Sequence, residues 1–326
     1  MSKQMMRAAQ VATWGSTPQF ITTTRPYPLP NHTEVRVKAA GIHQVVRSRV
    51  SGQHYTAGTL PHTPGVDGVG LALPDLTPVY FSAFATGSMA EIINVPSHAI
   101  IPLSVDKLGA SGISLAAVAA WVNPAMSSWM ALKKRVVLSE EQKRDGFSVL
   151  VIGATSASGQ LAIKLARELG ATRVVGAARS EEGLANLELD EIVVLREDLP
   201  KTDFSVEAIG SVDVVLDYVF RDVADRFFES VEVMRGKELQ YVQIGALGGK
   251  LEVKVNGAML RSKNITIRGS GPGAWSMEDM GTELRGLVDV VVGGEFLKGM
   301  YVKEIDIERI EEAWNDKGKD RVALTF

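Results

Sequence analysis

The stretch from 149 to 244 constrains the fold more than any other part of the chain, because short apolar runs alternate there with amphipathic segments. The apolar runs have the length of β-strands and occupy residues 149–152, 173–177, 192–195, 212–216 and 240–244. Between the first two runs, Leu161, Leu165 and Leu169 recur on one face of a predicted helix. Strands that alternate with helices predict a parallel sheet with helices on both faces, an α/β doubly wound fold.

The segments on either side of this stretch have a different character. The first 120 residues read as β-rich, since residues 35–39 alternate as a half-buried strand and Gly and Pro recur at short intervals. A helix-compatible apolar stretch begins at Leu115, and we expect Asn123-Pro124 to interrupt it. Residues 265–268 are a candidate extension of the parallel sheet. Beyond them, two amphipathic helices and a final strand at 322–326 are expected.

Composition narrows the classes of protein. The 326 residues suggest about two domains, and a net charge of -3 without a basic block argues against a nucleic-acid or anionic-membrane partner. The absence of cysteine excludes disulfides, thiolate catalysis and thiolate metal sites. No apolar run reaches the ~18 residues of a membrane span, and the first ten residues lack a signal-peptide core. We therefore expect a cytoplasmic protein.

Histidine is confined to one part of the chain. All five histidines precede residue 99: His32, His43, His54, His62 and His98. Any imidazole that acts as an acid, a base or a ligand must therefore come from the β-rich segment.

The first apolar run of the alternating stretch leads into a loop of small residues, Gly153-Ala-Thr-Ser-Ala-Ser-Gly159. Small residues at such a turn let backbone N–H groups and a helix N-terminus approach a dinucleotide pyrophosphate. The strict G-x-G-x-x-G pattern fails, because Ala154 and Ser156 occupy the first two glycine positions. On the motif alone a plain strand–helix turn remains possible, but the surrounding alternation favours a dinucleotide site.

The residue at the end of the second run indicates which dinucleotide binds. An NAD site places Asp or Glu about 20 residues after the last glycine, whereas counting from Gly159 reaches Arg179. A guanidinium there suits the 2′-phosphate of NADPH. The alternative is a solvated Arg179 followed by Ser180 as the cap of the next helix, and the two roles are compatible.

Several short segments, taken in order, resemble the medium-chain dehydrogenase/reductase superfamily, and specifically its zinc-free quinone oxidoreductase branch. They occupy residues 39–42, 60–70, 87–91, 125–129, 153–159 and 241–246. The resemblance implies a GroES-like catalytic domain at 1–120, completed by 266–326, with a Rossmann NADP-binding domain inserted at 121–265. It also implies an active site in the cleft between the domains and a homodimer or tetramer that associates through the Rossmann sheet.

Zinc-containing relatives place metal ligands at three positions that here hold His43, Val66 and Asn123. One imidazole, one valine and one amide do not make a catalytic zinc site. Without a Lewis acid, a quinone or a conjugated C=C is easier to reduce than an isolated ketone. The resemblance therefore favours an NADPH-dependent reductase of quinones or α,β-unsaturated carbonyls.

The same resemblance carries site residues over by position. The candidate catalytic residues are Tyr55, His43 and Asn123. Tyr55 stands where related quinone reductases have an active-site tyrosine, although a packing role is equally open, and His43 is either a hydrogen-bond donor to the carbonyl or a polar wall. The candidate cofactor-binding residues are Ser127, Ala154, Thr155, Ser156, Ala157, Ser158, Gly159, Arg179, Ser180, Asp217, Tyr218, Gly245, Ala246, Leu247, Gly269, Ser270 and Gly271. For Asp217 a simple turn cap is the alternative.

Two other functions stay open at this point. Some chains of this fold bind NADPH but act as sensors or as binding partners. A trans-acting enoyl reductase of secondary metabolism would act on acyl thioesters instead of quinones.

Overall fold

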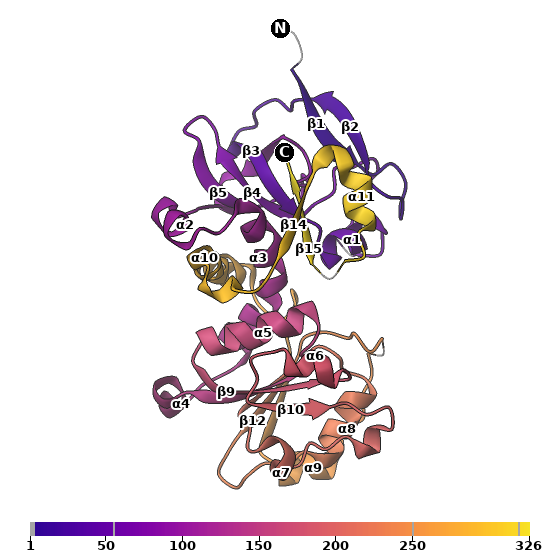
Figure 1. The fold of residues 1–326 in the computed structure, drawn as a ribbon, viewed down its shortest axis with the longest axis vertical. Coiled ribbons are helices and arrows are strands. Elements are labelled where there is room, and N and C mark those ends of the chain that lie inside the picture. The colour runs from indigo at the N-terminus through magenta and orange to yellow at the C-terminus, as the bar shows by residue number, and fades with distance from the viewer. Residues whose placement is uncertain (1–3, 55, 250, 319) are drawn as a thin grey trace. The chain divides into compact units, whose positions relative to one another are not determined.

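The structure is a computed structural model that describes residues 4–54, 56–249, 251–318 and 320–326, with the side chain of Met277 left out. The chain divides into two compact units. The first unit comprises Met1–Asn123 and Leu284–Phe326, and the second comprises Pro124–Glu283. Each unit is built around its own sheet (Figure 1).

The second unit contains a sheet of six parallel strands in the order β10-β9-β8-β11-β12-β13. The strands are β8 (Phe147–Ile152), β9 (Ala171–Ala178), β10 (Glu191–Val194), β11 (Val214–Asp217), β12 (Leu239–Gln243) and β13 (Ile265–Gly269). The chain winds outward from β8 in one direction and then, from β11, in the other. This confirms the doubly wound Rossmann sheet, whose switch point lies between β8 and β11.

Helices cover both faces of this sheet, α5 and α6 on one side and α8 and α9 on the other (Figure 1). The helices of the unit are α4 (Glu140–Asp145), α5 (Ala157–Glu168), α6 (Glu181–Ala185), α7 (Val206–Ile209), α8 (Asp222–Ser230) and α9 (Gly257–Ser262). On α8, Phe227 and Phe228 are buried against Tyr241 of β12, with ring centroids 5.6 and 4.7 Å away. The apolar helical stripe therefore fixes this side of the core.

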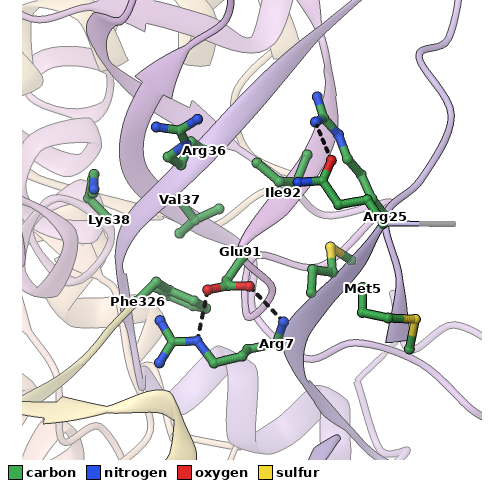
Figure 2. A pocket seen from close by; sticks show the side chains of 11 residues that line it. Met5, Arg7, Arg25, Arg36, Val37, Lys38, Glu91, Ile92 and Phe326 are labelled. Atoms are coloured by element: carbon green, nitrogen blue, oxygen red, sulfur yellow. Dashed lines mark hydrogen bonds and ion pairs between the residues drawn. The ribbon is translucent and has the colours of Figure 1, made fainter. Parts of the chain in front are cut away.

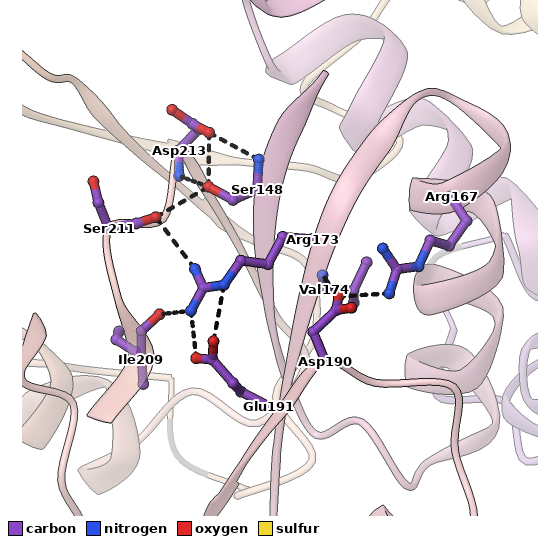
Figure 3. A network of polar contacts seen from close by, with 9 residues as sticks. All are labelled: Ser148, Arg167, Arg173, Val174, Asp190, Glu191, Ile209, Ser211 and Asp213. Atoms are coloured by element: carbon purple, nitrogen blue, oxygen red, sulfur yellow. Dashed lines mark hydrogen bonds and ion pairs between the residues drawn. The ribbon is translucent and has the colours of Figure 1, made fainter. Parts of the chain in front are cut away.

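The amino ends of the strands are joined by polar contacts (Figure 3). Arg173 of β9 pairs with Glu191 of β10 and donates hydrogen bonds to the carbonyl oxygens of Ile209 and Ser211, which precede β11. These contacts tie β9 to its neighbour β10 and to the segment that leads into β11, at the end of the sheet opposite the carboxyl ends of the strands.

The first unit contains a seven-stranded sheet in which β14-β15-β3-β4-β5-β7 are neighbours and β6 pairs with β3, together with the β1-β2 hairpin. The strands are β1 (Met5–Gln10), β2 (Gln19–Thr24), β3 (His32–Gly41), β4 (Asp67–Ala72), β5 (Thr77–Ser82), β6 (Ile92–Pro96), β7 (Ile100–Pro102), β14 (Val302–Asp306) and β15 (Arg321–Thr325). The short helices are α1 (Gln44–Val50), α2 (Val105–Ser111) and α11 (Ile310–Asn315). Because β15 pairs antiparallel with β3, the C-terminal segment completes the β-rich, GroES-like unit, as expected.

Two long helices, α3 (Leu115–Met130) and α10 (Met277–Gly293), each begin in one unit and end in the other. The expected interruption at Asn123-Pro124 is wrong, since α3 continues through Pro124 into a π-helical turn at Ala131–Arg135. Buried packing of Ala119, Val122 and Ala125 outweighs the hydrogen bond that the proline removes.

The same helix bears on the expectation that no apolar run is long enough to span a membrane. By length and composition the helical stretch Leu115–Arg135 could cross a membrane, since an 18-residue window in it has a mean hydropathy of 1.2, but 67% of that window is buried inside the protein. That burial is the property of a core helix.

The predicted domain boundaries also differ from those of the structure. The first lies at 123/124 instead of 120/121, and the second at 283/284 instead of 265/266. Residues beyond the predicted boundary contact the second unit: β13 pairs with β12, Arg135 donates to the carbonyl of Ala274, and Trp129 donates to Glu283. The strand β14 has no counterpart in the sequence analysis; only its pairing with β15 shows it.

Candidate functional site

A pocket of about 570 Å³ lies at the carboxyl ends of the strands in the second unit. Its walls come from residues at or just after the ends of five strands: 153 with 155–156, 178–179, 195–197 with 199, 219–223 and 247–248. Ligands of open parallel sheets bind in the crevice at the switch point of the strand order, which is where this pocket lies.

The loop after β8 forms one wall of the pocket. The N–H groups of Gly153 and Ala154 both donate to the carbonyl of Ala177, at 2.8 and 3.1 Å, which holds the loop against β9. A Cβ atom on Gly159 would lie 2.2 Å from the Gly153 oxygen, so only glycine allows α5 to pack this closely. The loop therefore keeps the glycine that controls helix–strand packing while it lacks the other two.

The N-terminus of α5 faces this loop. Ser156 caps the helix, because its Oγ accepts the N–H of Gly159 at 3.0 Å. The N–H groups of Ala157 and Ser158, in the first turn, have no intrahelical acceptor. Of the residues predicted here, Thr155 and Ser156 line the pocket, whereas the side chain of Ala154 is fully buried behind it.

Arg179 follows β9 and lines the pocket. Its side chain is exposed and has no ion pair or hydrogen bond within the described part of the chain. Ser180 caps α6 by accepting the N–H of Gly183 at 3.0 Å. The cap is thus confirmed, and it leaves the neighbouring guanidinium available to a ligand.

Two further arginines, which the sequence analysis missed, also line the pocket. Arg196 follows β10 and Arg221 follows β11, each beside an acidic neighbour, Glu197 and Asp222. The signal for Arg196 is the same as for Arg179, a basic residue directly after an apolar run. For Arg221 no such signal exists, because the chain turns for several residues after β11.

That turn is built on Asp217, whose carboxylate is fully buried. It accepts the N–H groups of Val219 and Phe220 at 2.7 and 2.9 Å, and the hydroxyl of Tyr241 donates to its other oxygen. Burial raises the pKa of Asp217 above the ordinary value for an aspartate. Asp217 is therefore a turn cap, the alternative left open above, and it is not among the residues that line the pocket.

Tyr218 is buried as well and likewise does not line the pocket. Its hydroxyl forms a 2.6 Å hydrogen bond with Ser128 of α3, and burial raises its pKa above the ordinary tyrosine value. The backbone that follows, from Val219 to Val223, provides the pocket wall instead. Because helices cover both faces of the parallel sheet, the consecutive side chains of Asp217 and Tyr218 are both buried.

The remaining predicted cofactor residues lie outside the pocket except for one. Leu247 lines it and is 68% exposed, directly after Gly245 and Ala246. Ser127 is half-buried on α3 and donates to the Pro124 carbonyl at 3.2 Å. Gly269 is the last residue of the edge strand β13, Ser270 and Gly271 follow it, and the Oγ of Ser270 accepts from Trp275 at 3.3 Å.

His43 belongs to a buried network in the first unit. Its Nε2 lies 3.1 Å from Oδ1 of Asp67, and the hydroxyl of Tyr80 donates to Oδ2 of the same carboxylate at 2.5 Å. The three side chains are no more than 2% exposed. Nδ1 of His43 has no hydrogen-bond partner in the described ranges. Of the two ring nitrogens of His43, Nε2 is therefore engaged by Asp67, and the buried Nδ1 is the one left without a partner in this network.

The other two candidate catalytic residues are less defined. Asn123 is half-buried on α3, where the first unit ends. Tyr55 lies outside the described residues. Within residues 4–54, 56–249, 251–318 and 320–326, no three His, Cys, Asp or Glu side chains are grouped so as to hold a metal ion, and Val66 is completely buried.

The first unit has a pocket of its own, of about 250 Å³, between β1, β3 and the C-terminal residue (Figure 2). Its arginines are largely engaged, since Arg7 pairs with Glu91 at 2.7 Å and Arg25 pairs with Glu34 at 3.1 Å. The carboxylates of Glu91 and Glu34 thus engage two of the arginines at this pocket.

Comparison with known proteins agrees with this architecture. No protein-family model matches the chain. It is 38% identical over 322 residues to a protein of Emericella nidulans named a probable NADPH-dependent quinone reductase, tdiC, with 87% of this chain and 89% of that protein covered. The human quinone oxidoreductase is 24% identical over 287 residues, covering 82% of this chain and 80% of its own.

A solved structure extends the likeness to the fold. The quinone oxidoreductase of Thermus thermophilus, also solved in complex with NADPH, superposes with a TM-score of 0.73 at 21% identity, covering 98% of this chain and all of its own. With two units of matching architecture and a relative of this similarity, the chain belongs to the quinone reductase-like branch of the medium-chain dehydrogenase/reductase superfamily.

Proposed function

We propose that this protein is an NADPH-dependent oxidoreductase that reduces a quinone or an α,β-unsaturated carbonyl without a metal. The observation that carries the proposal is the pocket at the carboxyl edge of the Rossmann sheet, with Arg179 unpaired on its wall. The name of the Emericella nidulans relative supports the same substrate class over acyl thioesters and over a purely sensing role.

The residues present fit a dinucleotide phosphate. Gly159 permits the close approach of α5, and its first-turn N–H groups suit a pyrophosphate. Arg179 and Arg196 follow neighbouring strands, so both guanidinium groups are placed for a 2′-phosphate beyond the end of β9. When bound, NADPH supplies a hydride to an electrophilic carbon of the substrate.

The protein's own contribution is to orient the substrate and to stabilise its oxygen. We assign Tyr55 as the hydroxyl donor to that oxygen, with Asn123 and His43 as the other polar candidates. Because Asp67 accepts from Nε2, neutral His43 carries its proton there and offers Nδ1 only as an acceptor. In this tautomer His43 is a polar wall of the site, and the donor role falls to Tyr55 and Asn123.

We further propose that the protein is a cytoplasmic homodimer that pairs through β13. This strand is the last in the sheet order, so one of its edges carries no strand within the described residues. Exposed apolar side chains occur on it and before it, including Ile267 at 39%, Leu260 at 48% and Leu251 at 78%. An unpaired strand with apolar neighbours is a suitable surface for a second copy.

The cofactor assignment is tested by binding of NADPH and NADH to the wild type and to Arg179→Ala, measured by calorimetry. Losing a charge-assisted contact costs ~1.5–3 kcal/mol, so Arg179→Ala should bind NADPH roughly 10–150-fold more weakly than the wild type. Its affinity for NADH should be nearly unchanged. Arg235→Ala, an exposed arginine of the same unit away from the pocket, is the control. Equal affinities of the wild type for NADPH and NADH would contradict the assignment.

The reaction is tested separately by NADPH oxidation with a panel of quinones and enones. Turnover with at least one member of the panel is expected. Binding of NADPH without turnover of any of them would instead favour the sensing role.

A further inference from the structure

The turn after β11 contains two adjacent residues with left-handed backbone. Phe220 has φ 58°, and Arg221 has φ 62° with ψ −144°, a combination that is normally confined to glycine. Neither residue is glycine, so the fold must hold both against their local preference. Strain of this kind persists only where the surrounding structure over-determines the backbone.

The surrounding contacts do so on two sides. Asp217 accepts the N–H groups of Val219 and Phe220 from beneath the turn. From the loop after β12, Gly248 donates its N–H to the carbonyl of Val219 at 2.9 Å. A Cβ on Gly248 would lie 2.8 Å from that carbonyl and 3.0 Å from Cβ of Arg221, so the two loops are in close contact.

The result is a guanidinium held at two of its nitrogens. Nε of Arg221 pairs with Asp222 at 2.9 Å, and Nη1 donates to the carbonyl of Gly248 at 3.0 Å. For Nη2 no acceptor is found among the residues described. Arg221 also lines the pocket, together with Thr155 and Ser156 at the N-terminus of α5. It is thus a preorganised donor in a pocket whose other end holds Arg179 and Arg196.

We propose that Arg221 is a pyrophosphate ligand of the cofactor, acting together with the N-terminus of α5, while Arg179 and Arg196 serve the 2′-phosphate. The inference rests on the proposed NADPH function. It follows from the positions of the strands: Arg179 and Arg196 follow β9 and β10 on one side of β8, whereas Arg221 follows β11 on the other. A dinucleotide phosphate carries two anionic groups, and the pocket offers two separate groups of cations.

The test compares dissociation constants of NADPH and NADH for Arg221→Met, Arg179→Ala and the control Arg235→Met, measured by calorimetry with the protein unmodified otherwise. Both nucleotides contain the pyrophosphate, so Arg221→Met should raise the dissociation constants of NADPH and NADH by the same factor, at least about 10-fold. The NADPH-to-NADH affinity ratio should stay at the wild-type value, whereas Arg179→Ala should lower it. Arg235→Met should change neither constant.

Two variants guard against a folding defect in Arg221→Met. Arg221→Lys keeps the positive charge but lacks the several N–H donors of the guanidinium. Its dissociation constants for NADPH and NADH should lie between those of the wild type and those of Arg221→Met. Gly248→Ala keeps the arginine but places a methyl group against the Cβ of Arg221. It should weaken the binding of NADPH and of NADH by the same factor. A loss of affinity for NADPH alone would overturn the proposal by assigning Arg221 to the 2′-phosphate instead. Unchanged dissociation constants for both nucleotides would also overturn it. Failure of wild type to bind either nucleotide would overturn the proposed function instead.

Discussion

Tyr80→Phe is a sharp perturbation, because it removes one oxygen atom from the core of the first unit and leaves the ring in place. The hydroxyl donates to Oδ2 of Asp67 at 2.5 Å, and both residues are at most 2% exposed. The only other side-chain donor to that carboxylate in the described residues is Nε2 of His43, on the opposite oxygen. The mutation therefore leaves Oδ2 buried without a partner.

The expected magnitude follows from the burial and the charge. A hydrogen bond to an ionised group contributes ~1.5–3 kcal/mol, and an abandoned buried acceptor costs a similar amount. Since phenylalanine retains the apolar packing, we expect the free energy of unfolding to fall by about 2 kcal/mol. Adding Asp67→Asn should show a coupling energy of about 1 kcal/mol or more in a double-mutant cycle, because the two side chains are in contact.

Urea unfolding followed by tryptophan fluorescence measures this change. Three of the five tryptophans, Trp14, Trp121 and Trp314, belong to the first unit and report its transition. Tyr301→Phe is the matched control, since Tyr301 lies in the same unit and is 74% exposed. A Tyr80→Phe protein within about 0.5 kcal/mol of the control would refute the reasoning, because surface substitutions span that range.

Burial raises the pKa of Tyr80, Tyr218 and Tyr241 above the ordinary value of 10.0. Since the folded pKa exceeds the unfolded one, stability is full below about pH 10 and falls above it, by up to ~1.4 kcal/mol per pH unit for each tyrosine; the tyrosinate absorbance of these three should appear only on unfolding. Activity should be unaffected by a chelator, because His43, Val66 and Asn123 do not form a zinc site, and stoichiometric zinc in elemental analysis would contradict this. Gly159→Val should lower both the melting temperature and NADPH affinity, because a Cβ there would lie 2.2 Å from the Gly153 oxygen; retained affinity would show that the loop can shift. Tyr55→Phe should lower kcat on enones at least about tenfold with NADPH affinity unchanged, since it removes a donor to the developing oxyanion; an unchanged kcat would mean that solvent supplies the proton.

Local patterns in the chain were enough to predict the parallel sheet and much of its cofactor edge. Strand-length apolar runs, the leucine stripe of α5, the cap Ser180 and Arg179 all depend on neighbours within a few residues. The physical preferences that create them are local, namely burial of one helical face and satisfaction of the first N–H groups of a helix. For that reason they can be read without knowledge of the fold.

What only the tertiary structure decided depends on contacts between distant segments. Pro124 lies inside a helix because the surrounding core stabilises α3, and β14 exists as a strand because β15 lies beside it. Arg196 and Arg221 lie far apart in the chain, and the strand order brings both to one pocket. The roles of His43 and Asp217 were likewise decided by partners 24 residues away in each case, Asp67 and Tyr241. A polar side chain shows its type in the sequence, but its hydrogen-bond partners, and hence the atom left for chemistry, are determined by which strands become neighbours.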